Sequence, residues 1–492
     1  METAKLTDDL AANSRMIMNV IGHNHDVVLR ELAIGSRGIK AAVIYISGLV
    51  ESQKLNEYVI KPLLLMEISQ EVAMTGKLKE EMMTHVVKLE DVGELNDLNG
   101  CIESILDGKS VLIADGVTGG IVLNTSGGTR RSINEPVSET LVRGPREGFI
   151  ESIETNISLL RRSIKDPAFT MLKTTLGRRT KRSVAVAFMD GIVNDHIVET
   201  VMLRLGKIDI DDVPESGYIE QFIEDNHYSP FPQSMSTERP DKVVSALLEG
   251  RVAILLDGTP FVLVVPVTFP MLLQSPEDYY ERWPIGSLVR LLRFVIAFFA
   301  LFLPSIYIAC TSYHPGLIPT RLAMSITASR EGVPFPTLVE ALIMEVTIEI
   351  LREAGIRLPK PIGQAVGIVG GLVIGEAAVR AGIVSPIMVI VVAVTAISSF
   401  ALPQYGISIS IRILRFFMMF AAAVFGLYGI MLVFLLVCSH VMKLKSFGVN
   451  YAGTFVHYRL NDWKDTFVRF PLQLMRKRPE FLKPGERKRA KP

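Results

Sequence analysis

The sequence predicts an α/β soluble N-terminal half, built from two duplicated subdomains joined by a helical linker, and an all-α transmembrane domain after it. Three observations support this prediction. Charged residues recur every few positions up to about residue 285, long uncharged runs follow, and two stretches of the first half repeat each other. A chain of 492 residues is long enough for several such units.

Composition narrows the class of protein. The 52 basic and 51 acidic residues nearly cancel, so the overall charge does not indicate a nucleic-acid partner. The three cysteines (Cys101, Cys310 and Cys438) are far apart, which favours a reducing compartment over a disulfide framework. The N-terminus lacks a basic segment followed by an apolar stretch, so no signal peptide is predicted. We expect residues 1–26 to be flexible and the soluble half to be cytoplasmic.

The first half contains an internal duplication. AAVIYISGLV at 41–50 matches VAVAFMDGIV at 184–193, because each is an apolar, strand-like run interrupted by a glycine near its end. ILDGKSVLIADG at 105–116 matches LLEGRVAILLDG at 247–258, with a helix end, a strand and an Asp-Gly hairpin turn in each. Each copy is predicted to be a small α/β unit with a mixed sheet.

The spacing of glycines agrees with the duplication. Gly48 and Gly108 are 60 residues apart, and the matching Gly191 and Gly250 are 59 apart. Agreement in kind, order and spacing predicts two equivalent subdomains with a helix between them. The predicted boundaries are 27–141 and 169–285 for the subdomains and 142–168 for the linker.

Nearly uncharged runs predict the membrane domain at 286–445. An acidic stretch, Phe335–Arg352, is expected to form an amphipathic helix that does not span, because carboxylates facing lipid are costly. Four spans keep both chain ends on one side, with the basic tail at 446–492 cytoplasmic; five spans stay open. The predicted spans are Phe294–Cys310, Pro361–Val379, Ile383–Leu402 and Phe416–Val441.

Motifs for catalysis are missing from the sequence. GxxxxGK[ST], HExxH and GxSxG do not occur, so we predict neither an enzyme nor a cofactor. His23 and His25 beside Asp26 indicate a polar loop more than a metal site. The sequence assigns no residues to ligand binding.

A glycine-rich run is the most informative membrane feature. Its glycines recur at i, i+4, i+7, i+8 and i+12 and make one smooth helix face. Such a face allows neighbouring helices to pack closely; alternatively, symmetry-related copies line a narrow pathway with it. The candidate pore-lining or gating residues are Gly363, Val366, Gly367, Val369, Gly370, Gly371, Val373 and Gly375.

Three carboxylates are candidates for attracting cations near a pore mouth: Glu345, Glu349 and Glu376. Glu345 and Glu349 are four residues apart, so a helix places them on one stripe. The alternative is that both are solvated on an interfacial helix. Arg380 is four residues after Glu376 and is a predicted ion-pair partner for it.

The run VRGPREGF at 142–149, with LRR at 160–162, resembles the signature of GerA-type spore germinant receptor A subunits, a family that includes a stage V sporulation paralogue. REAGIRLP at 352–359 and DWKDT at 462–466 also fit. The resemblance covers roughly residues 27–480. The matching signature residues are Arg143, Gly144, Pro145, Arg146, Glu147, Gly148, Arg161 and Arg162.

The resemblance implies a multi-pass protein of the spore inner membrane that takes part in nutrient-triggered germination. Its implied partners are a transporter-like B subunit, a lipoprotein C subunit, membrane lipid and further copies of itself, as a pentamer. The homo-oligomer would be a ligand-gated channel that releases monovalent cations. A non-conducting scaffold and a secondary transporter are the alternatives. The choice between receptor subunit and sporulation paralogue stays open.

Overall fold

The computed structural model describes residues 4–67, 78–89, 91–127, 135–136, 138–359, 370–371, 373–455 and 460–490. The chain divides into two compact units. We call them the repeat unit and the helical unit. The repeat unit comprises Met1–Glu224, Ser234–Pro266 and Arg476–Pro492, and the helical unit comprises Asp225–Gln233 and Val267–Met475.

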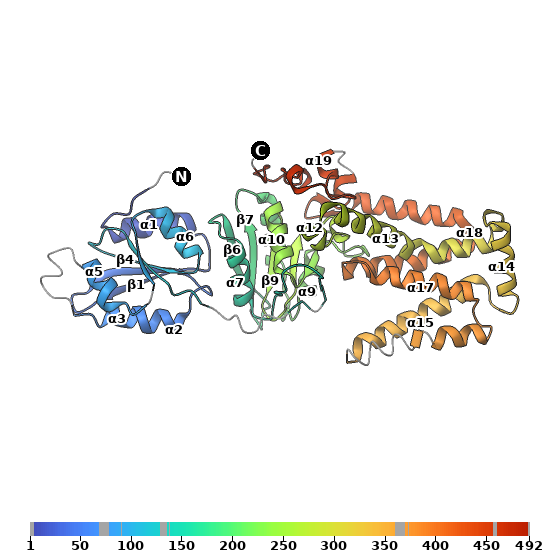
Figure 1. Ribbon diagram of the computed structural model, residues 1–492, viewed down its shortest axis with the longest axis horizontal. Coiled ribbons are helices and arrows are strands. Elements are labelled where there is room, and N and C mark those ends of the chain that lie inside the picture. Colours follow the sequence, from blue (N-terminus) through green and yellow to red (C-terminus); the bar gives the residue numbers. More distant parts are fainter. Residues whose placement is uncertain are drawn as a thin grey trace. The chain divides into compact units, whose positions relative to one another are not determined.

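The repeat unit contains the predicted duplication. Its two five-stranded sheets have equivalent strand orders, β1-β2-β4-β5-β3 and β6-β7-β9-β10-β8 (Figure 1). The strands of the first sheet are β1 Val27–Ile34, β2 Ile39–Ile46, β3 Val92–Leu95, β4 Ser110–Ala114 and β5 Gly120–Leu123. Those of the second are β6 Phe169–Leu176, β7 Arg182–Met189, β8 Met235–Thr237, β9 Val252–Leu256 and β10 Val262–Val265.

The strand pairs of both sheets are antiparallel, so the predicted mixed sheet is wrong. Tight turns join β1 to β2, β4 to β5, β6 to β7 and β9 to β10, and such turns can join only antiparallel neighbours. The two Asp-Gly turns are confirmed. Gly116 between β4 and β5 has φ 75°, and Gly258 between β9 and β10 has φ 95°, a region that side chains rarely adopt.

Helices cover both faces of the first sheet (Figure 1). One face packs against the N-terminal helix α1 and against α6, and the other packs against the short helices between β2 and β3. Their bounds are α1 Leu10–Ile21, α2 Ser52–Leu55, η1 Asn56–Ile60, α3 Lys61–Leu64, α5 Leu78–Glu81, η2 Met82–Val86 and α6 Leu98–Leu106.

Residues 1–26 were predicted to be flexible, but Leu10–Ile21 within this range forms the packed helix α1. The Asp9 side chain accepts a hydrogen bond from the Ala11 N–H and caps α1. Ile17 and Ile21 are one turn apart and fully buried in the same core as β2 and β4. This helix is short and amphipathic, and it is stable only when its apolar side packs against the sheet, so the polar N-terminal sequence alone did not predict it.

The predicted linker is helical over only part of its length. α7 (Ile153–Ser163) packs with α10 (Pro240–Glu249) against β7 and β9. It therefore belongs to the second repeat, where it has the place that α1 has in the first. α8 (Asp195–Gly206) and α9 (Ser216–Ile223) complete that repeat.

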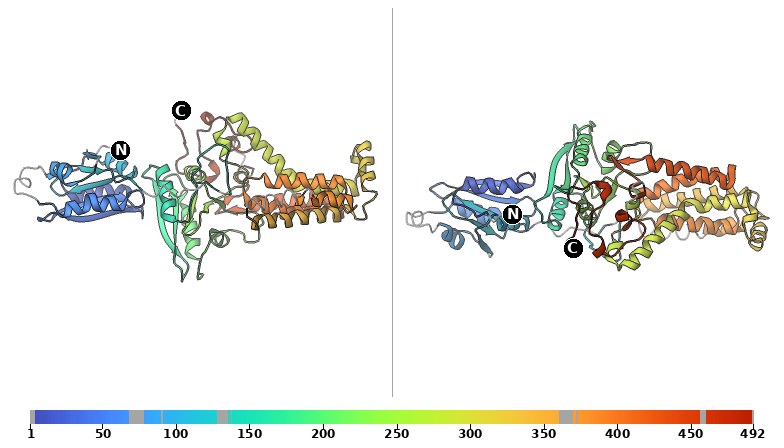
Figure 2. Two further views of the ribbon diagram at one scale, coloured as in Figure 1. Left: turned by 60° about the horizontal axis from the view of Figure 1, so that its bottom comes forward. Right: turned by 90° about the horizontal axis from the view of Figure 1, so that it is seen from above.

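The helical unit is a bundle of α13, α15, α17 and α18 with smaller elements at its ends (Figure 2). Two of its helices, α13 and α18, are long and apolar enough to cross a membrane, and α17 is apolar but shorter. The elements are α11 Phe269–Leu272, α12 Glu277–Tyr280, α13 Trp283–Ser312, η3 Pro315–Leu317, α14 Thr320–Arg330, α15 Thr337–Arg357, α17 Pro386–Phe400, α18 Tyr405–Lys443, β11 Lys445–Ser446, β12 Val449–Asn450, η4 Gly453–Phe455, α19 Leu460–Trp463 and η5 Leu472–Leu474.

α18 is two helical arms rather than the single predicted span. Gly426 has φ 63° and ψ −142°, which is not helical. A Cβ added at Gly429 would collide with the Ala421 carbonyl, eight residues back, so the chain reverses here. The Tyr313 hydroxyl donates to the carbonyls of Ala423 (2.6 Å) and Val424 (3.1 Å), which the break frees from helical bonding.

Contacts at both arms show that they are antiparallel. Ser410, early in the first arm, donates to the Pro230 carbonyl. His440, late in the second arm, lies 2.8 Å from the Ser229 hydroxyl and stacks on Phe231. We call this end of the bundle the Ser229 end and the opposite one the Gly426 end.

The other helices join these two ends. α13 reaches the Gly426 end at Tyr313, and α15 starts there because Thr311 bonds to Thr337 at 3.3 Å. α17 also starts there, where the Ser385 N–H donates to Glu340 at 2.9 Å. Between α15 and α17, residues 370–371 and 373–380 are helical. Phe269, before α13, and His440, near the end of α18, both pack on Phe231, so the described helices enter and leave the bundle at the Ser229 end, which requires an even number of traversals.

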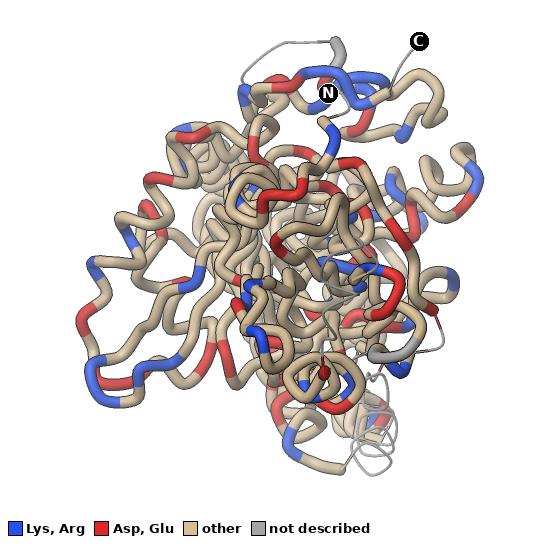
Figure 3. The backbone as a smooth tube through the Cα atoms, turned by 90° about the vertical axis from the view of Figure 1, so that its left-hand side faces the viewer, with Lys and Arg blue, Asp and Glu red and all other residues tan. Residues whose placement is uncertain are grey.

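The predicted C-terminal tail at 446–492 is also divided. Residues up to Met475 belong to the helical unit, and Arg476–Pro492 belongs to the repeat unit. η6 (Glu480–Leu482) lies in this last segment. Figure 3 shows basic residues gathered along the chain close to the C-terminus. Leu482 in this segment is 1% exposed, so part of it is packed rather than free.

Candidate functional site

A cluster of charged side chains lies between α15 and α18, toward the Ser229 end. Glu345 Oε2 is 2.9 Å from Arg415 Nη2, and both side chains are 1% exposed. Glu349 extends the cluster, with Oε2 2.8 Å from Arg412 Nη1 and Oε1 3.2 Å from Arg352 Nη1. Glu345 and Glu349 are one turn apart on one face of α15, as predicted, and both reach α18.

The cluster combines two carboxylates with three guanidinium groups. Glu345 and Glu349 therefore face arginines within one chain instead of forming an unpaired acidic stripe. Removing one partner of a buried pair leaves an uncompensated charge and costs about 3 to 5 kcal/mol. The geometry thus gives these carboxylates a structural task, and their predicted role in attracting cations stays a prediction.

The third candidate carboxylate is exposed. Glu376 Oε1 accepts from Arg380 Nη2 at 2.6 Å, which confirms the ion pair predicted from the four-residue spacing. Both side chains are more than half exposed. Solvent screens such a pair, so it contributes little to stability. Its role near a pore mouth stays a prediction.

Two of the candidate pore glycines lie against neighbouring helices. A Cβ added at Gly370 would meet Leu351 Cδ2 of α15 at 2.8 Å. One added at Gly375 would meet Val389 Cγ1 of α17 at 3.5 Å. These two positions therefore support the packing interpretation of the glycine face.

Two other candidates are open in the single chain. No described atom lies within 4 Å of a Cβ added at Gly371, and Val373 is 55% exposed. They are available to a neighbouring molecule or to a pathway. The remaining candidates lie outside the described residues; they are Gly363, Val366, Gly367 and Val369.

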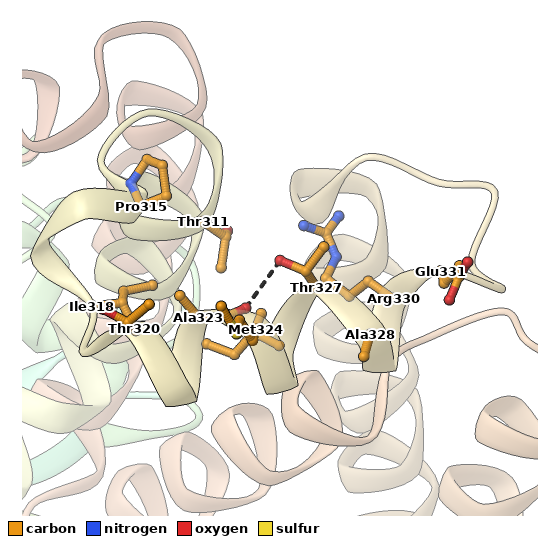
Figure 4. A pocket seen from close by; sticks show the side chains of 11 residues that line it. Thr311, Pro315, Ile318, Thr320, Ala323, Met324, Thr327, Ala328, Arg330 and Glu331 are labelled. Atoms are coloured by element: carbon orange, nitrogen blue, oxygen red, sulfur yellow. Dashed lines mark hydrogen bonds between the residues drawn. The ribbon is translucent and has the colours of Figure 1, made fainter.

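A cavity of about 840 Å³ lies at the Gly426 end, between the end of α13 and one face of α14 (Figure 4). Its polar side chains are largely used within the fold. Thr311 donates to the Tyr307 carbonyl, Thr327 to the Ala323 carbonyl, and Arg330 pairs with the fully buried Glu340. We therefore assign no ligand to this cavity.

The signature residues separate into an exposed loop and a buried joint. Arg143, Gly144, Pro145, Arg146 and Glu147 are exposed, and Gly148 is buried. The loop is tied to the second repeat where Arg239 donates to the Pro145 carbonyl at 2.9 Å. Arg162 donates to the Gly127 carbonyl at 2.9 Å.

Arg161 is the centre of the joint between the two repeats. Its guanidinium forms two 2.8 Å bonds to Asp26, a third to Asn24 Oδ1 and a fourth to the Phe169 carbonyl. It also lies over the Phe169 ring at 4.7 Å. Asp26 is therefore buried in an ion pair, whereas the sequence predicted a polar terminal loop at this position.

A second ionic cluster lies at the start of α13 in the helical unit. Asp278 is 1% exposed and pairs with Arg290 at 3.1 Å and with Arg293 at 2.6 Å. Arg290 also reaches Asp465 of the DWKDT motif at 2.7 Å. The DWKDT motif is visible in the sequence, but its pairing with Arg290 is not. Arg290 is 12 residues from Asp278 and 175 residues from Asp465 in the sequence, so no local pattern predicts these contacts.

A family model described as the Bacillus/Clostridium GerA spore germination protein matches residues 15–481. The chain belongs to the GerA family. Among its relatives, spore germination protein B1 of Bacillus subtilis is 44% identical, and the match covers 96% of this chain and 97% of that one. Spore germination protein GerLA of Bacillus cereus is 42% identical over 98% of this chain and 99% of its own length.

A solved structure also matches this GerA-family chain. It is the N-terminal domain of the A subunit of the Bacillus megaterium spore germinant receptor GerK3, with 34% identity and a TM-score of 0.43. The match covers 55% of this chain and 99% of that one. The family resemblance expected from the arginine-rich signature is thereby confirmed by the sequence relatives.

Proposed function

We propose that this GerA-family chain is a membrane-embedded A-type subunit of a spore germinant receptor, and that its copies assemble into a channel for monovalent cations. A role in spore germination follows from its relatives. The observation that carries the membrane proposal is the exterior of the helical unit. Large apolar side chains of α13 and α18 are exposed there, including Leu288, Phe298, Phe417 and Phe425.

The path of the chain supports a topology with both ends on one side. An even number of traversals returns the chain to the Ser229 end. Arg352, Arg412 and Arg415 also lie toward that end, so they need no place on the outer side of the membrane. Positively charged segments favour the cytoplasmic side, which supports a cytoplasmic Ser229 end in the spore inner membrane.

The open side of the glycine face supports assembly. Gly371 and Val373 present a small, exposed surface that the single chain leaves uncovered by described residues. Small residues let helices of separate molecules approach closely, and copies arranged around an axis would bring these positions together. The pentamer, the B and C partner subunits and the gating by nutrient rest on the family resemblance and belong to this proposal.

Potassium efflux from liposomes tests the channel. The purified chain is reconstituted alone and together with its B and C partners, with Gly371→Leu and Ala377→Leu compared. Gly371→Leu has room within one chain, so a change in efflux at this position reports the pathway or the contact between copies. Ala377 is exposed in the helical residues 373–380 and should tolerate the matched change.

The acidic residues are tested in the same liposomes. If Glu345 and Glu349 attract cations, Glu345→Gln with Glu349→Gln lowers efflux while the thermal midpoint stays near that of the wild type. If their task is to pair with arginine, the double substitution lowers the thermal midpoint of the chain, whatever its effect on efflux. Sealed liposomes containing inserted oligomers and all three subunits would contradict the channel and favour the non-conducting scaffold.

A further inference from the structure

The two repeats have an equivalent surface at one end of each sheet. It contains the turn that follows the second strand, at Gly48 in one repeat and Gly191 in the other. It also contains the C-terminal end of the helix before the next strand, at Gly108 and Gly250. All four glycines have positive φ, between 72° and 96°, so the backbone of the two surfaces follows the same course.

In the first repeat, the second repeat covers this surface. A Cβ added at Gly48 would meet Ser158 Oγ of α7 at 2.5 Å, because α7 lies directly on the turn. Just after α7, Lys165 Nζ lies 2.7 Å from Asp107 at the C-terminal end of α6. A cation is favourable there because the carbonyl end of a helix carries partial negative charge.

In the second repeat, the C-terminal segment covers the equivalent surface. The Gly485 N–H donates to the Ile192 carbonyl at 3.1 Å, and the Glu486 N–H donates to the Gly191 carbonyl at 3.0 Å. Arg478 Nε donates to the Leu248 carbonyl at 2.8 Å, at the C-terminal end of α10. Arg478 thus has the place that Lys165 has on the first repeat.

The segment is shaped by its own contacts as well. Arg478 Nη1 donates to the Glu486 carbonyl and pairs with the Glu486 carboxylate, both at 3.1 Å, and the Arg478 N–H donates to the Arg487 carbonyl at 2.9 Å. The Arg478 side chain is 8% exposed. One arginine therefore closes the segment on itself and joins it to α10.

We propose that this end of the second repeat is a docking surface, and that residues 478–486 are its intramolecular ligand, bound where a further repeat would bind. Repeat proteins need a cap on an end surface that would otherwise be open. The segment follows directly on Met475, the last residue of the helical unit. Its only described helix is the three-residue η6, and segments of this kind open at a lower free energy than core elements, so we take the docking to be reversible.

Hydrogen exchange on the full-length chain in nanodiscs tests the docking. The amide protons of Gly485 and Glu486 are bonded in the docked state and open when the segment leaves. Arg478→Gln removes the charged donor to α10 and should speed exchange at these amides about tenfold or more. Arg487→Gln makes the same charge change on an exposed side chain and should leave exchange as in the wild type.

A fluorescent peptide of residues 476–490 tests the surface itself. It should bind the full-length Arg478→Gln chain at least about tenfold more tightly than the wild type, whose surface is occupied by its own segment. Peptide carrying the same Arg478→Gln change is the matched control and should bind neither chain well.

Three results would overturn the proposal. One is unprotected exchange at Gly485 and Glu486 in the wild type, and another is exchange that Arg478→Gln leaves unchanged. The third is peptide binding that is equal for the two chains. These measurements report only whether the segment is docked, so they test this proposal independently of the proposed ion conduction.

Discussion

Buried arginines hold this protein together at points where distant parts of the sequence meet. Arg161 joins the two repeats, and Arg415 joins α15 to α18; each is 1% exposed and lies within 3 Å of a carboxylate that is also 1% exposed. Burying a charge is costly unless it is paired and hydrogen-bonded. Such a pair therefore fixes geometry more than it adds stability, since either partner alone would be strongly unfavourable.

Arg161→Met is expected to lower the free energy of unfolding by about 3 to 5 kcal/mol, because it leaves the Asp26 carboxylate buried without its partner. The thermal midpoint of the purified chain measures this. Combining Arg161→Met with Asp26→Asn should recover part of the loss. Arg179→Ala, at an exposed side chain, is the control and should change stability by less than about 0.5 kcal/mol. Equal effects of the Arg161 and Arg179 substitutions would disprove the structural role of the Arg161–Asp26 pair.

Two glutamates near α9 should respond to pH in opposite ways. Burial raises the pKa of Glu220 above its ordinary value, despite the bond from the Ser234 hydroxyl. Burial acts on Glu215 too, but bonds from the Gly217 N–H and the hydroxyls of Ser216 and Thr259 outweigh it and lower the pKa. Each environment therefore favours a different protonation state.

The direction of the pH effect follows from these shifts. Folded Glu220 holds its proton more tightly than the unfolded chain does, so its contribution is complete below the ordinary pKa of 4.5 and is lost as pH rises through the folded value. Folded Glu215 contributes above 4.5 and loses that contribution as pH falls. Glu220→Gln should thus gain thermal stability over the wild type from pH 4 to pH 7, whereas Glu215→Gln should lose it. Parallel curves for both variants would contradict this assignment.

At the scale of elements, the reversal of α18 depends on one glycine. Gly426→Ala is expected to cost about 1 to 3 kcal/mol, because φ 63° is strained for a side chain. The new Cβ would also lie 2.8 Å from His314 Cε1. The thermal midpoint in detergent should fall. Gly316→Ala, where no described atom lies within 4 Å, should leave it unchanged within about 0.5 kcal/mol.

The turn at Gly426 also decides how the helical unit is threaded. Two arms of α18, of about 30 and 25 Å at 1.5 Å per residue, are long enough to cross most of a bilayer core. One uninterrupted helix would instead leave His440 far from Ser229. With this threading, the ion pairs between α15 and the first arm lie toward the Ser229 end, where the chain also enters and leaves the bundle.

At the scale of the whole molecule, the even number of traversals predicts that both chain ends label from the same side of a membrane. Single cysteines at Arg37 and Arg489 should react with an impermeant maleimide in inside-out vesicles and stay protected in right-side-out vesicles. A cysteine at Gly316, at the Gly426 end, should show the reverse. Cys310 and Cys438 are replaced by serine in these chains, and the buried Cys101 is kept. If cysteines at positions 37 and 489 were labelled from opposite sides of the membrane, the even number of traversals would be wrong.

Local patterns in the sequence determined much of this protein. The spacing of glycines and strand-like runs predicted the duplication, and both Asp-Gly turns form hairpins, because turn chemistry acts over a few residues. The stripe of Glu345 and Glu349 and the pair of Glu376 with Arg380 follow from helix periodicity. The signature around Arg143 to Arg162 indicated the family that the relatives confirm.

The tertiary structure decided what depends on residues far apart in the chain. Asp26 and Arg161 are separated by 135 residues, and Glu349 and Arg412 by 63, so no local pattern in the sequence predicts these ion pairs. The apolar run on both sides of Gly426 is typical of one continuous span, and the reversal is stabilised by Tyr313 from another helix. Leu10–Ile21 forms a helix because the sheet buries Ile17 and Ile21. In each case the deciding contribution is burial or pairing against a partner that only folding brings into contact.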